Sequence, residues 1–365
     1  MRRFAINGRF LTRRPTGVDR FAIELIGSID RILAREECSN GSIEFRILVP
    51  RGDTLSYNFS CMNVMRVGKF KGQFWEQIEL PLALQRDEFL ISLCNTGPAF
   101  LGRHVVAIHD AATVNAPSAF SAGFRFWYGA LMPVLGRRAQ RVLTVSQFSR
   151  GEIHREFGVP DRKISVVSEG GEHIKRVESF SYTISKFRLD RKPFILAVSS
   201  MAEHKNFRLV VEALSRISDP PFDVAIAGGA NARVFGNSGL LDSDSVRLLG
   251  YVSDSELRAL YENALAFVFP SIYEGFGIPP LEAMVCGCPV LASTAASIPE
   301  VCGDAALYFD PRSSEELAAL MLKIASDETL RMELRDRGYR RSQQFSWDLG
   351  ARQVLKVCAE LGSLR

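Results

Sequence analysis

The sequence lacks any apolar run approaching the ~18 residues of a membrane-spanning helix, and its start, MRRFAINGRF, is not the long apolar stretch of a signal peptide. None of its seven cysteines forms a pair at the two-residue spacing of metal sites. Cys286 and Cys288 flank one glycine, and we expect them to be small core residues. No basic run dominates, which argues against a nucleic-acid partner. These absences predict a soluble cytoplasmic protein.

The composition is that of an ordinary globular chain, with 47% hydrophobic and 24% charged residues, and a length of 365 residues suggests two domains. Short apolar runs alternate with helical patterns, which predicts parallel sheets covered by helices. The first series of predicted strands comprises Phe4–Asn7, Phe45–Val49, Phe89–Leu93, Val105–His109, Val142–Val145 and Ile164–Val167. The second comprises Phe194–Val198, Asp223–Ala227, Val246–Leu249, Ala266–Phe269, Pro289–Ala292 and Ala306–Phe309.

The most informative segment is SIYEGFGIPPLEAMVCGCPVLAS, in which Glu274 and Glu282 bracket a glycine turn between an apolar run and a short helix. Gly275 and Gly277 would take torsions that other residues resist and let the backbone approach a ligand. A helix starting there would point free N–H groups at an anion, while the carboxylates accept hydrogen bonds from sugar hydroxyls. The segment therefore predicts a sugar-nucleotide site. A surface loop is the alternative, because two glutamates eight apart are common by chance.

This segment resembles the signature of glycosyltransferase family 4, where seven residues stand between two glutamates. The similarity extends upstream through LLGYVSDSELRALYENALAFVFPS and downstream through SIPEVCGDAALYFDP, from about Leu248 to Pro311. The resemblance implies an α/β fold of the GT-B type, with two Rossmann-like doubly wound domains facing across a cleft. It matches group 1 glycosyltransferases of bacterial polysaccharide and lipopolysaccharide synthesis.

The resemblance also implies roles for individual residues. Glu282 would bind the nucleotide ribose, Glu274 the donor-sugar hydroxyls, and the amides around Phe276 and Gly277 the diphosphate or sugar. Lys205, in SSMAEHKNFRLVVEAL, would balance the diphosphate charge. The remaining implied donor-binding residues are Gly17, Ser200, Val252, Gly275 and Ile278.

Ser200 departs from the pattern, because many relatives carry an arginine near this position. The departure puts a second phosphate-binding cation in doubt and leaves Arg208 or Arg13 as substitutes. The motif Asp242-Ser243-Asp244 invites a metal interpretation, but it lies in a serine-rich loop of the kind that forms turns. We therefore expect no metal and no cofactor, with Lys205 and helix amides meeting the leaving-group charge.

In the first half of the chain, His109 and Asp110 end the apolar run VVAIHD. A histidine just past the carboxyl end of a strand points into the cleft of such a sheet, and the resemblance places a donor-contacting histidine here. His109 is thus implied as a catalytic-site residue with Glu274 and Lys205, while Asp110 supports local geometry. Gly17 lies in the loop LTRRPTGVDRFAIEL, where a plain tight turn is the alternative, and Arg20 matches a family arginine.

Four regions are predicted. Residues 1–175 form an acceptor-side Rossmann-like domain, 176–192 a polar linker, and 193–342 the sugar-nucleotide-binding Rossmann-like domain. Residues 343–365 form a helix with Ser346 as N-cap, which in the family packs back on the first domain.

Two segments of the first domain suggest acceptor or membrane contacts. FSAGFRFWYGALMPVLGRRAQR combines aromatics and arginines in a basic amphipathic pattern, which favours weak peripheral contact with the inner face of a membrane. Packing in the core explains the aromatics equally well. In FKGQFWEQIELPLAL, Trp75, Glu76 and Gln77 face either the acceptor or the protein interior.

The function predicted is transfer of a hexose from a nucleoside diphosphate sugar to a hydroxyl of a glycan or lipid-linked acceptor. The resemblance implies retention at the anomeric carbon, and mannose from GDP-mannose is the first candidate for the donor. A non-catalytic sugar-nucleotide-binding protein, or a GT-B epimerase or phosphorylase, is the alternative.

Overall fold

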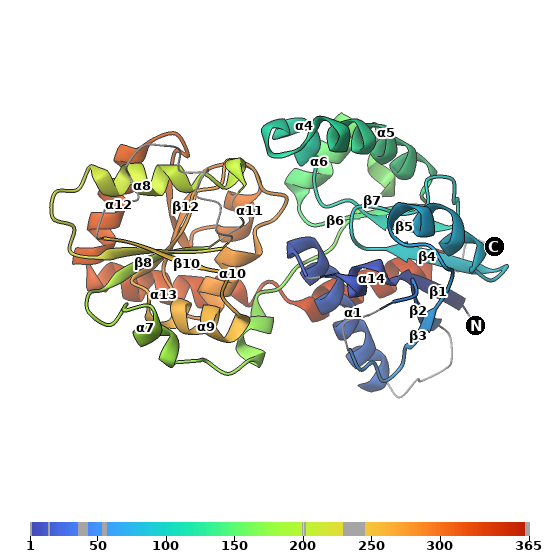
Figure 1. Cartoon of the computed structure of the whole chain (residues 1–365), viewed down its shortest axis with the longest axis horizontal. Helices are drawn as coiled ribbons and strands as arrows, with labels where there is room; N and C mark the ends of the chain where they lie inside the picture. Colours follow the sequence, from blue (N-terminus) through green and yellow to red (C-terminus); the bar gives the residue numbers. More distant parts are fainter. Residues whose placement is uncertain are drawn as a thin grey trace. The chain divides into compact units, whose positions relative to one another are not determined.

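The computed structural model describes residues 2–13, 15–35, 43–52, 57–198, 200, 202–228 and 245–361. The chain folds into two compact units, both visible in Figure 1. The first comprises Met1–Val114, Ser121–Glu169 and Trp347–Arg365, and the second comprises Asn115–Phe120 and Gly170–Ser346. Within the described ranges, no helix combines the length and apolar character needed to cross a membrane.

The first unit is built on a seven-stranded parallel sheet in the order β3-β2-β1-β4-β5-β6-β7. Its strands are β1 (Arg2–Asn7), β2 (Ile43–Val49), β3 (Asn63–Arg66), β4 (Glu88–Ser92), β5 (His104–Ala107), β6 (Arg141–Thr144) and β7 (Ile164–Val166). Phe4–Ile6 of β1 and Val105–Ala107 of β5 are buried apolar runs, because helices cover both faces of a parallel sheet. The order reverses between β1 and β4, as in doubly wound nucleotide-binding folds.

The main helices of this unit are α1 (Gly17–Arg35), α5 (Ala122–Arg138), α6 (Gln147–Phe157) and α14 (Trp347–Leu361). A further helical stretch has a π-helical turn, η2 (Trp75–Glu79), between α2 (Gly72–Phe74) and α3 (Leu80–Leu82). Shorter elements are η1 (Gly8–Thr12), α4 (Ala112–Asn115) and η4 (Asp161–Lys163). Helix α14 packs along α1, and the Phe21 ring lies edge-on to Trp347 at 6.2 Å between centroids.

The second unit contains a six-stranded parallel sheet in the order β10-β9-β8-β11-β12-β13. Its strands are β8 (Phe194–Val198), β9 (Asp223–Ala227), β10 (Val246–Gly250), β11 (Ala266–Phe269), β12 (Val290–Ser293) and β13 (Ala306–Phe309). Numbered from its own first strand, this order is 3-2-1-4-5-6, the Rossmann order. The sheet therefore reverses between β8 and β11.

Helices of the second unit pack on these strands or on one another. The helices are α8 (Phe207–Ser215), α9 (Asp254–Asn263), α10 (Ile278–Val285), α11 (Ile298–Cys302), α12 (Ser314–Ser326) and α13 (Glu328–Ser342). Short elements precede the sheet or follow β8: η5 (Glu172–Arg176), α7 (Tyr182–Lys186) and η6 (Glu203–Lys205). Phe207 and Val210 of α8 pack with Met321 of α12 in the core. A capping box between Ser253 and Glu256 fixes the start of α9.

Every predicted strand is present, and the structure adds β3, whose residues are all exposed. The segment expected as a linker, 176–192, holds α7 and lies in the second unit. It is ordered because α7 packs on α9, where Lys186 Nζ lies 2.5 Å from Glu256 Oε1. The polar, aperiodic sequence of this segment therefore forms a short surface helix of the second unit and not a linker between the units.

Candidate functional site

The second sheet reverses its order between β8 and β11, and ligands of open α/β sheets bind at the carboxyl ends of strands at such a point. The loops leaving these two strands are joined by the backbone: Ile272 N donates a hydrogen bond to His204 O at 2.8 Å. Asn206 braces the same place, because its side-chain amide donates to Pro270 O at 3.1 Å and Pro311 O at 2.8 Å.

An ion pair connects these loops. Lys205 Nζ lies 2.8 Å and 2.9 Å from the two carboxylate oxygens of Glu274. The Lys205 and Glu274 side chains are only 17% and 11% exposed. Burial and the Lys205 charge lower the pKa of His204 to about 4, so this imidazole is neutral at neutral pH. An ammonium has three N–H groups, so Lys205 can bind a phosphate oxygen and keep its contact with Glu274.

Buried hydroxyls hold the Glu274 turn in shape. Ser297 is fully buried, and its hydroxyl lies 3.0 Å from Glu274 O and 2.9 Å from Phe276 O. Below it, Ser293 Oγ donates to Ser271 O at 2.5 Å. A serine after a strand has no distinctive local pattern, so these two serines could not be predicted as part of the site.

The two glycines of the turn differ. Gly277 is the N-cap of α10 with φ 103°, and a Cβ there would lie 3.2 Å from the Phe269 ring. Gly275 does not have a positive φ, so the prediction of an unusual backbone torsion at this residue is wrong. Pro279 and Pro280 occupy the first turn of α10 and carry no N–H, so the predicted set of free amides is smaller than in an ordinary helix start.

Glu282 lies on α10 and is 8% exposed. His173 Nε2 lies 2.8 Å from its Oε1, and Tyr261 donates to its Oε2 at 3.1 Å. Burial raises the pKa of Tyr261, so the phenol keeps its proton and remains a donor. These two contacts orient the Glu282 carboxylate, which is an acceptor of the kind that ribose hydroxyls need. Sequence reasoning missed His173 and Tyr261.

The remaining donor-binding predictions fall in different surroundings. Ser200 is exposed after β8, Val252 is buried, and Phe276 packs edge-on to Phe345 at 5.7 Å between ring centroids. Ile278 is half-buried at the first turn of α10. Gly17 belongs to the first unit, at the first turn of α1, where a Cβ would meet nothing within 4 Å. Open space at Gly17 permits close approach of a ligand to the backbone.

The two arginines suggested as additional phosphate ligands are already paired. Arg13 binds Asp19, with Nη2 2.6 Å from Oδ1, and Asp19 also accepts from Thr16 N at 2.9 Å. Arg208 Nε lies 2.6 Å from Glu212 Oε1 on the exposed side of α8. Both guanidinium groups are therefore already neutralised by a carboxylate in this structure.

His109 follows β5 in the first unit and is 6% exposed. Its Nε2 lies 2.9 Å from Leu93 O, its backbone N–H donates to Asn95 Oδ1 at 2.8 Å, and its ring meets Phe21 edge-on at 4.7 Å. Because a carbonyl oxygen only accepts, Nε2 carries the proton. Burial lowers the pKa of His109, so the neutral ring offers Nδ1 as an acceptor. The neutral His109 ring can therefore accept a hydrogen bond from a sugar hydroxyl at Nδ1, but it cannot donate a proton from that nitrogen.

Asp110 caps the following turn, accepting from Ala112 N at 2.9 Å. Trp75 is fully buried and donates from Nε1 to Val67 O at 2.9 Å, which excludes it from a surface that faces an acceptor. Glu76 is 1% exposed, and its Oε2 lies 2.9 Å from Arg9 Nη1 while its Oε1 accepts from Asn7 at 2.7 Å. Both residues therefore have interior roles.

The Asp242-Ser243-Asp244 motif lies outside the described residues. Among the residues that the structure does describe, no group of three or more His, Cys, Asp or Glu side chains is arranged to hold a metal ion.

Comparison with known proteins identifies the family of the chain. Residues 183–341 match the model of "Glycosyl transferases group 1". The chain is 33% identical over 273 residues to the O-antigen chain mannosyltransferase B of Escherichia coli, covering 71% of each chain. It is 26% identical over 242 residues, 64% of each chain, to the N,N'-diacetylbacillosaminyl-diphospho-undecaprenol alpha-1,3-N-acetylgalactosaminyltransferase of Campylobacter jejuni.

Among solved structures, the sucrose-phosphate synthase of Thermosynechococcus elongatus matches with a TM-score of 0.76 and 18% identity, covering 100% of both chains. The predicted GT-B fold, with two Rossmann-like units, is thereby confirmed. From the family match and the identity to a mannosyltransferase over most of both sequences, the chain belongs to the group 1 glycosyl transferases.

Proposed function

We propose that this chain transfers a hexose, with mannose from GDP-mannose as the first candidate, to a hydroxyl of a glycan or lipid-linked acceptor in polysaccharide or lipopolysaccharide synthesis. The relative from Escherichia coli is named as an O-antigen mannosyltransferase. The relative from Campylobacter jejuni carries diphospho-undecaprenol in its name, which supports a lipid-linked acceptor.

The observation that carries the proposal is the Lys205–Glu274 pair at the point where the second sheet reverses its strand order. A partly buried cation at this place suits a diphosphate, and a carboxylate beside it suits sugar hydroxyls. Glu282, already oriented by His173 and Tyr261, supplies the acceptors that a ribose needs. The loops after β8 and β11, together with α10, thus carry groups for the diphosphate, the sugar and the ribose of a sugar nucleotide.

The chemistry proposed is transfer with retention of the anomeric configuration. The Glu274 carboxylate is held by Lys205 through both oxygens, which suits binding better than nucleophilic attack. We therefore infer front-face attack, in which the departing phosphate helps to take the acceptor proton. The protein lowers the barrier by positioning the reactants and balancing charge at the leaving group, with Lys205 in place of a divalent ion.

The test is a thermal-shift and calorimetric screen of wild type and Glu282→Ala against GDP, UDP, dTDP and ADP sugars, with and without EDTA. Stabilisation of the wild type alone by one nucleotide class, unchanged by EDTA, is expected and identifies the nucleotide class of the donor. Linkage predicts about 2.7 kcal/mol of added stability at a ligand concentration of 100 times Kd.

A matched control is Glu333→Ala, which removes an exposed glutamate of α13 in the second unit and should bind like wild type. Absence of binding by every nucleotide would overturn the assigned site. Turnover of the sugar nucleotide without an acceptor, or only with inorganic phosphate, would replace the transferase by an epimerase or a phosphorylase.

A further inference from the structure

The segment Glu274–Gly277, the donor turn, is held in shape through its backbone as well as through the Lys205 contact. The buried hydroxyl of Ser297 lies 3.0 Å from Glu274 O and 2.9 Å from Phe276 O. Ser297 is also the N-cap residue of α11, a helix of only five residues. The shape of the donor turn therefore depends on where α11 is held.

The C-terminal end of α11 is held by one arginine. Arg341, in the last turn of α13, donates from Nε to Val301 O at 2.9 Å and from Nη2 to Glu300 O. Its Nη1 donates to Gln344 Oε1 at 2.6 Å. Basic side chains can bind the last carbonyl groups of a helix, which have no partner within the helix. Arg341 therefore fixes the end of α11 that lies opposite Ser297.

The same arginine reaches the donor turn by a second route, through an aromatic pair. The guanidinium carbon of Arg341 lies over the Phe345 ring, 5.0 Å from its centroid. Phe345 packs edge-on to Phe276 at 5.7 Å between ring centroids, and Phe276 is only 6% exposed. A planar guanidinium can stack on a ring while its N–H groups bind acceptors in the same plane, which an ammonium cannot do. Arg341 therefore supports both the backbone and the aromatic side chain of the donor turn.

Close packing around α13 leaves little room for these contacts to shift. Gly303, the C-cap of α11, has φ 55°, and a Cβ there would lie 3.1 Å from Arg341 Nε. At Gly338, one turn earlier on α13, a Cβ would lie 3.2 Å from Met284 Cγ of α10. Helix α10 begins directly after the donor turn, and α13 packs along it. A change at the end of α13 should consequently be transmitted to the donor turn, because a close-packed interior passes on strain.

We propose that Arg341 is a positioning residue for the donor sugar. It holds the donor turn in the shape that presents the Glu274 carboxylate and the backbone N–H groups of Phe276 and Gly277 to the sugar. The inference rests on the proposed function, because it assigns a role toward the same donor site. Arg341 itself acts through α11 and Phe345 and does not touch the sugar.

The ribose end of the donor is held independently of Arg341. The Glu282 carboxylate is oriented by His173 and Tyr261, and neither residue contacts α11 through a hydrogen bond that the structure describes. Loss of Arg341 should therefore weaken binding of the sugar and spare most of the affinity for the nucleotide. A general loss of stability would weaken both to the same extent.

The test compares Arg341→Met with Arg331→Met in the full chain. Arg331 is the matched control, because it also lies on α13 and also binds the last carbonyl groups of a helix. Its Nη1 lies 2.7 Å from Ile324 O and 3.0 Å from Ala325 O of α12. Calorimetry measures the Kd for GDP and for GDP-mannose, or for the corresponding pair of the nucleotide class that stabilises the wild type. Thermal unfolding is recorded on the same samples.

Arg341→Met is expected to weaken GDP-mannose binding about tenfold, the equivalent of one or two hydrogen bonds to the sugar, with the Kd for GDP close to wild type. Arg331→Met should leave both Kd values unchanged, whatever it does to the unfolding midpoint. Arg341→Lys keeps the charge without the planar fork, so it should recover only part of the sugar affinity. Phe345→Leu removes the ring contact alone and should shift the same ratio in the same direction, even where Arg341→Met does not fold.

Equal weakening of GDP and GDP-mannose in Arg341→Met, or no weakening of either, would overturn the inference. The same selective loss in Arg331→Met would also overturn it, because helix capping anywhere on α13 would then explain the effect. A wild type that binds both ligands, with Arg341→Met behaving like Arg331→Met, removes this inference alone. A wild type that binds no nucleotide and no sugar nucleotide removes the proposed function together with it.

Discussion

The Lys205–Glu274 pair allows a measurement that separates catalysis from folding. Lys205→Met removes the ammonium and keeps a side chain of similar length, Glu274→Gln removes the carboxylate charge, and the double variant removes both. In the wild type the ammonium lies 2.8 Å and 2.9 Å from the two carboxylate oxygens, and both side chains are less than one-fifth exposed.

The structure gives different magnitudes for stability and activity. Each single variant leaves a partly buried charge without its partner, which costs about 1–3 kcal/mol of unfolding free energy. The double variant should recover part of this loss, because no unpaired charge remains. The rate constant should not recover: a missing preorganised charge at a leaving group lowers kcat about 10²- to 10³-fold.

The assay combines thermal unfolding with product formation at saturating donor. Lys186→Met is the matched control, since it breaks another lysine–glutamate pair of the second unit, with Glu256, away from the β8–β11 loops. It should leave kcat unchanged. A kcat of Lys205→Met within tenfold of wild type, or a double variant that regains activity along with stability, would contradict this prediction. Either result would make the pair a purely structural salt bridge.

Three further predictions follow from buried contacts. His173→Ala should raise the Kd for the donor nucleotide about tenfold with little change in kcat, because His173 orients Glu282, and calorimetry with His173→Gln should show partial rescue. Gly171→Ala should cost about 1–3 kcal/mol in urea unfolding, because its Cβ would lie 2.7 Å and 2.8 Å from the carbonyl carbon and oxygen of Leu281. A wild-type unfolding free energy in that variant would contradict the packing of η5 on α10. Burial lowers the pKa of His104 to about 3, so below about pH 6.5 the unfolded chain binds one more proton at this residue than the folded chain does. As the pH is lowered from 6.5, the unfolding free energy should therefore decrease, by about 1.4 kcal/mol per pH unit for this group. Urea unfolding from pH 7 to pH 5 checks this, and a slope unchanged in His104→Gln would refute the assignment.

Most of the fold could be predicted from sequence for a physical reason. Strands covered on both faces read as continuous apolar runs, and β8, β9, β11 and β13 have the predicted bounds. The missed strand, β3, is an edge strand with four exposed residues, so its sequence carries no burial signal. The expected linker was equally ambiguous, because a short helix held by ion pairs lacks an apolar stripe.

In the candidate site too, residues with a local sequence signal could be predicted and residues brought in by tertiary packing could not. Glu274 and Lys205 were both assigned from local motifs, and their direct contact results from the adjacency of β8 and β11. His173 stands 109 residues before Glu282 and reaches it only because η5 packs against α10. A contact between residues so far apart in the chain cannot be predicted from the spacing of residues within one motif. The ligand-binding roles of Glu274 and Lys205 could thus be proposed from the sequence, because each residue lies in a recognisable turn. His173, which orients Glu282, could be identified only from the structure.

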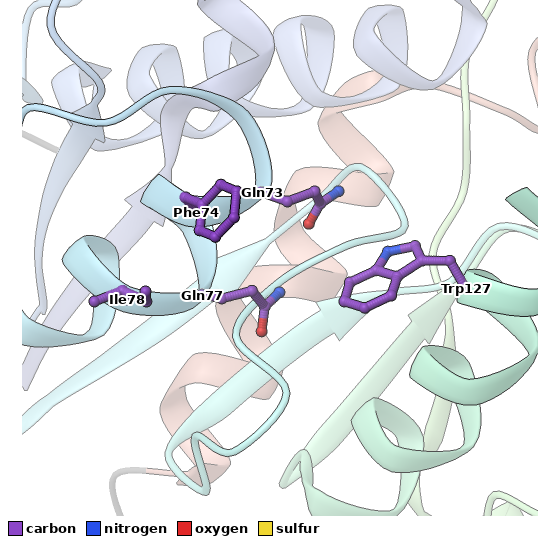
Figure 2. A pocket seen from close by; sticks show the side chains of 5 residues that line it. All are labelled: Gln73, Phe74, Gln77, Ile78 and Trp127. Carbon is purple, nitrogen blue, oxygen red and sulfur yellow. The ribbon is translucent and has the colours of Figure 1, made fainter. Parts of the chain in front are cut away.

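The stretch from Gly72 to Leu82 shows how a single hydrogen bond decides which side chains face solvent. Its sequence, GQFWEQIELPL, places Phe74 beside Trp75, and either aromatic could have been the buried one. The indole N–H of Trp75 requires a partner when buried and finds Val67 O, while Phe74 has no polar group to satisfy. Burial of Trp75 and Glu76 fixes the rotation of the π-turn, and this rotation turns Phe74 and Ile78 outward. The outward position of Phe74 and Ile78 (Figure 2) is therefore a consequence of polar groups satisfied behind them, which is why Trp75→Phe should loosen this turn although residue 75 itself is buried.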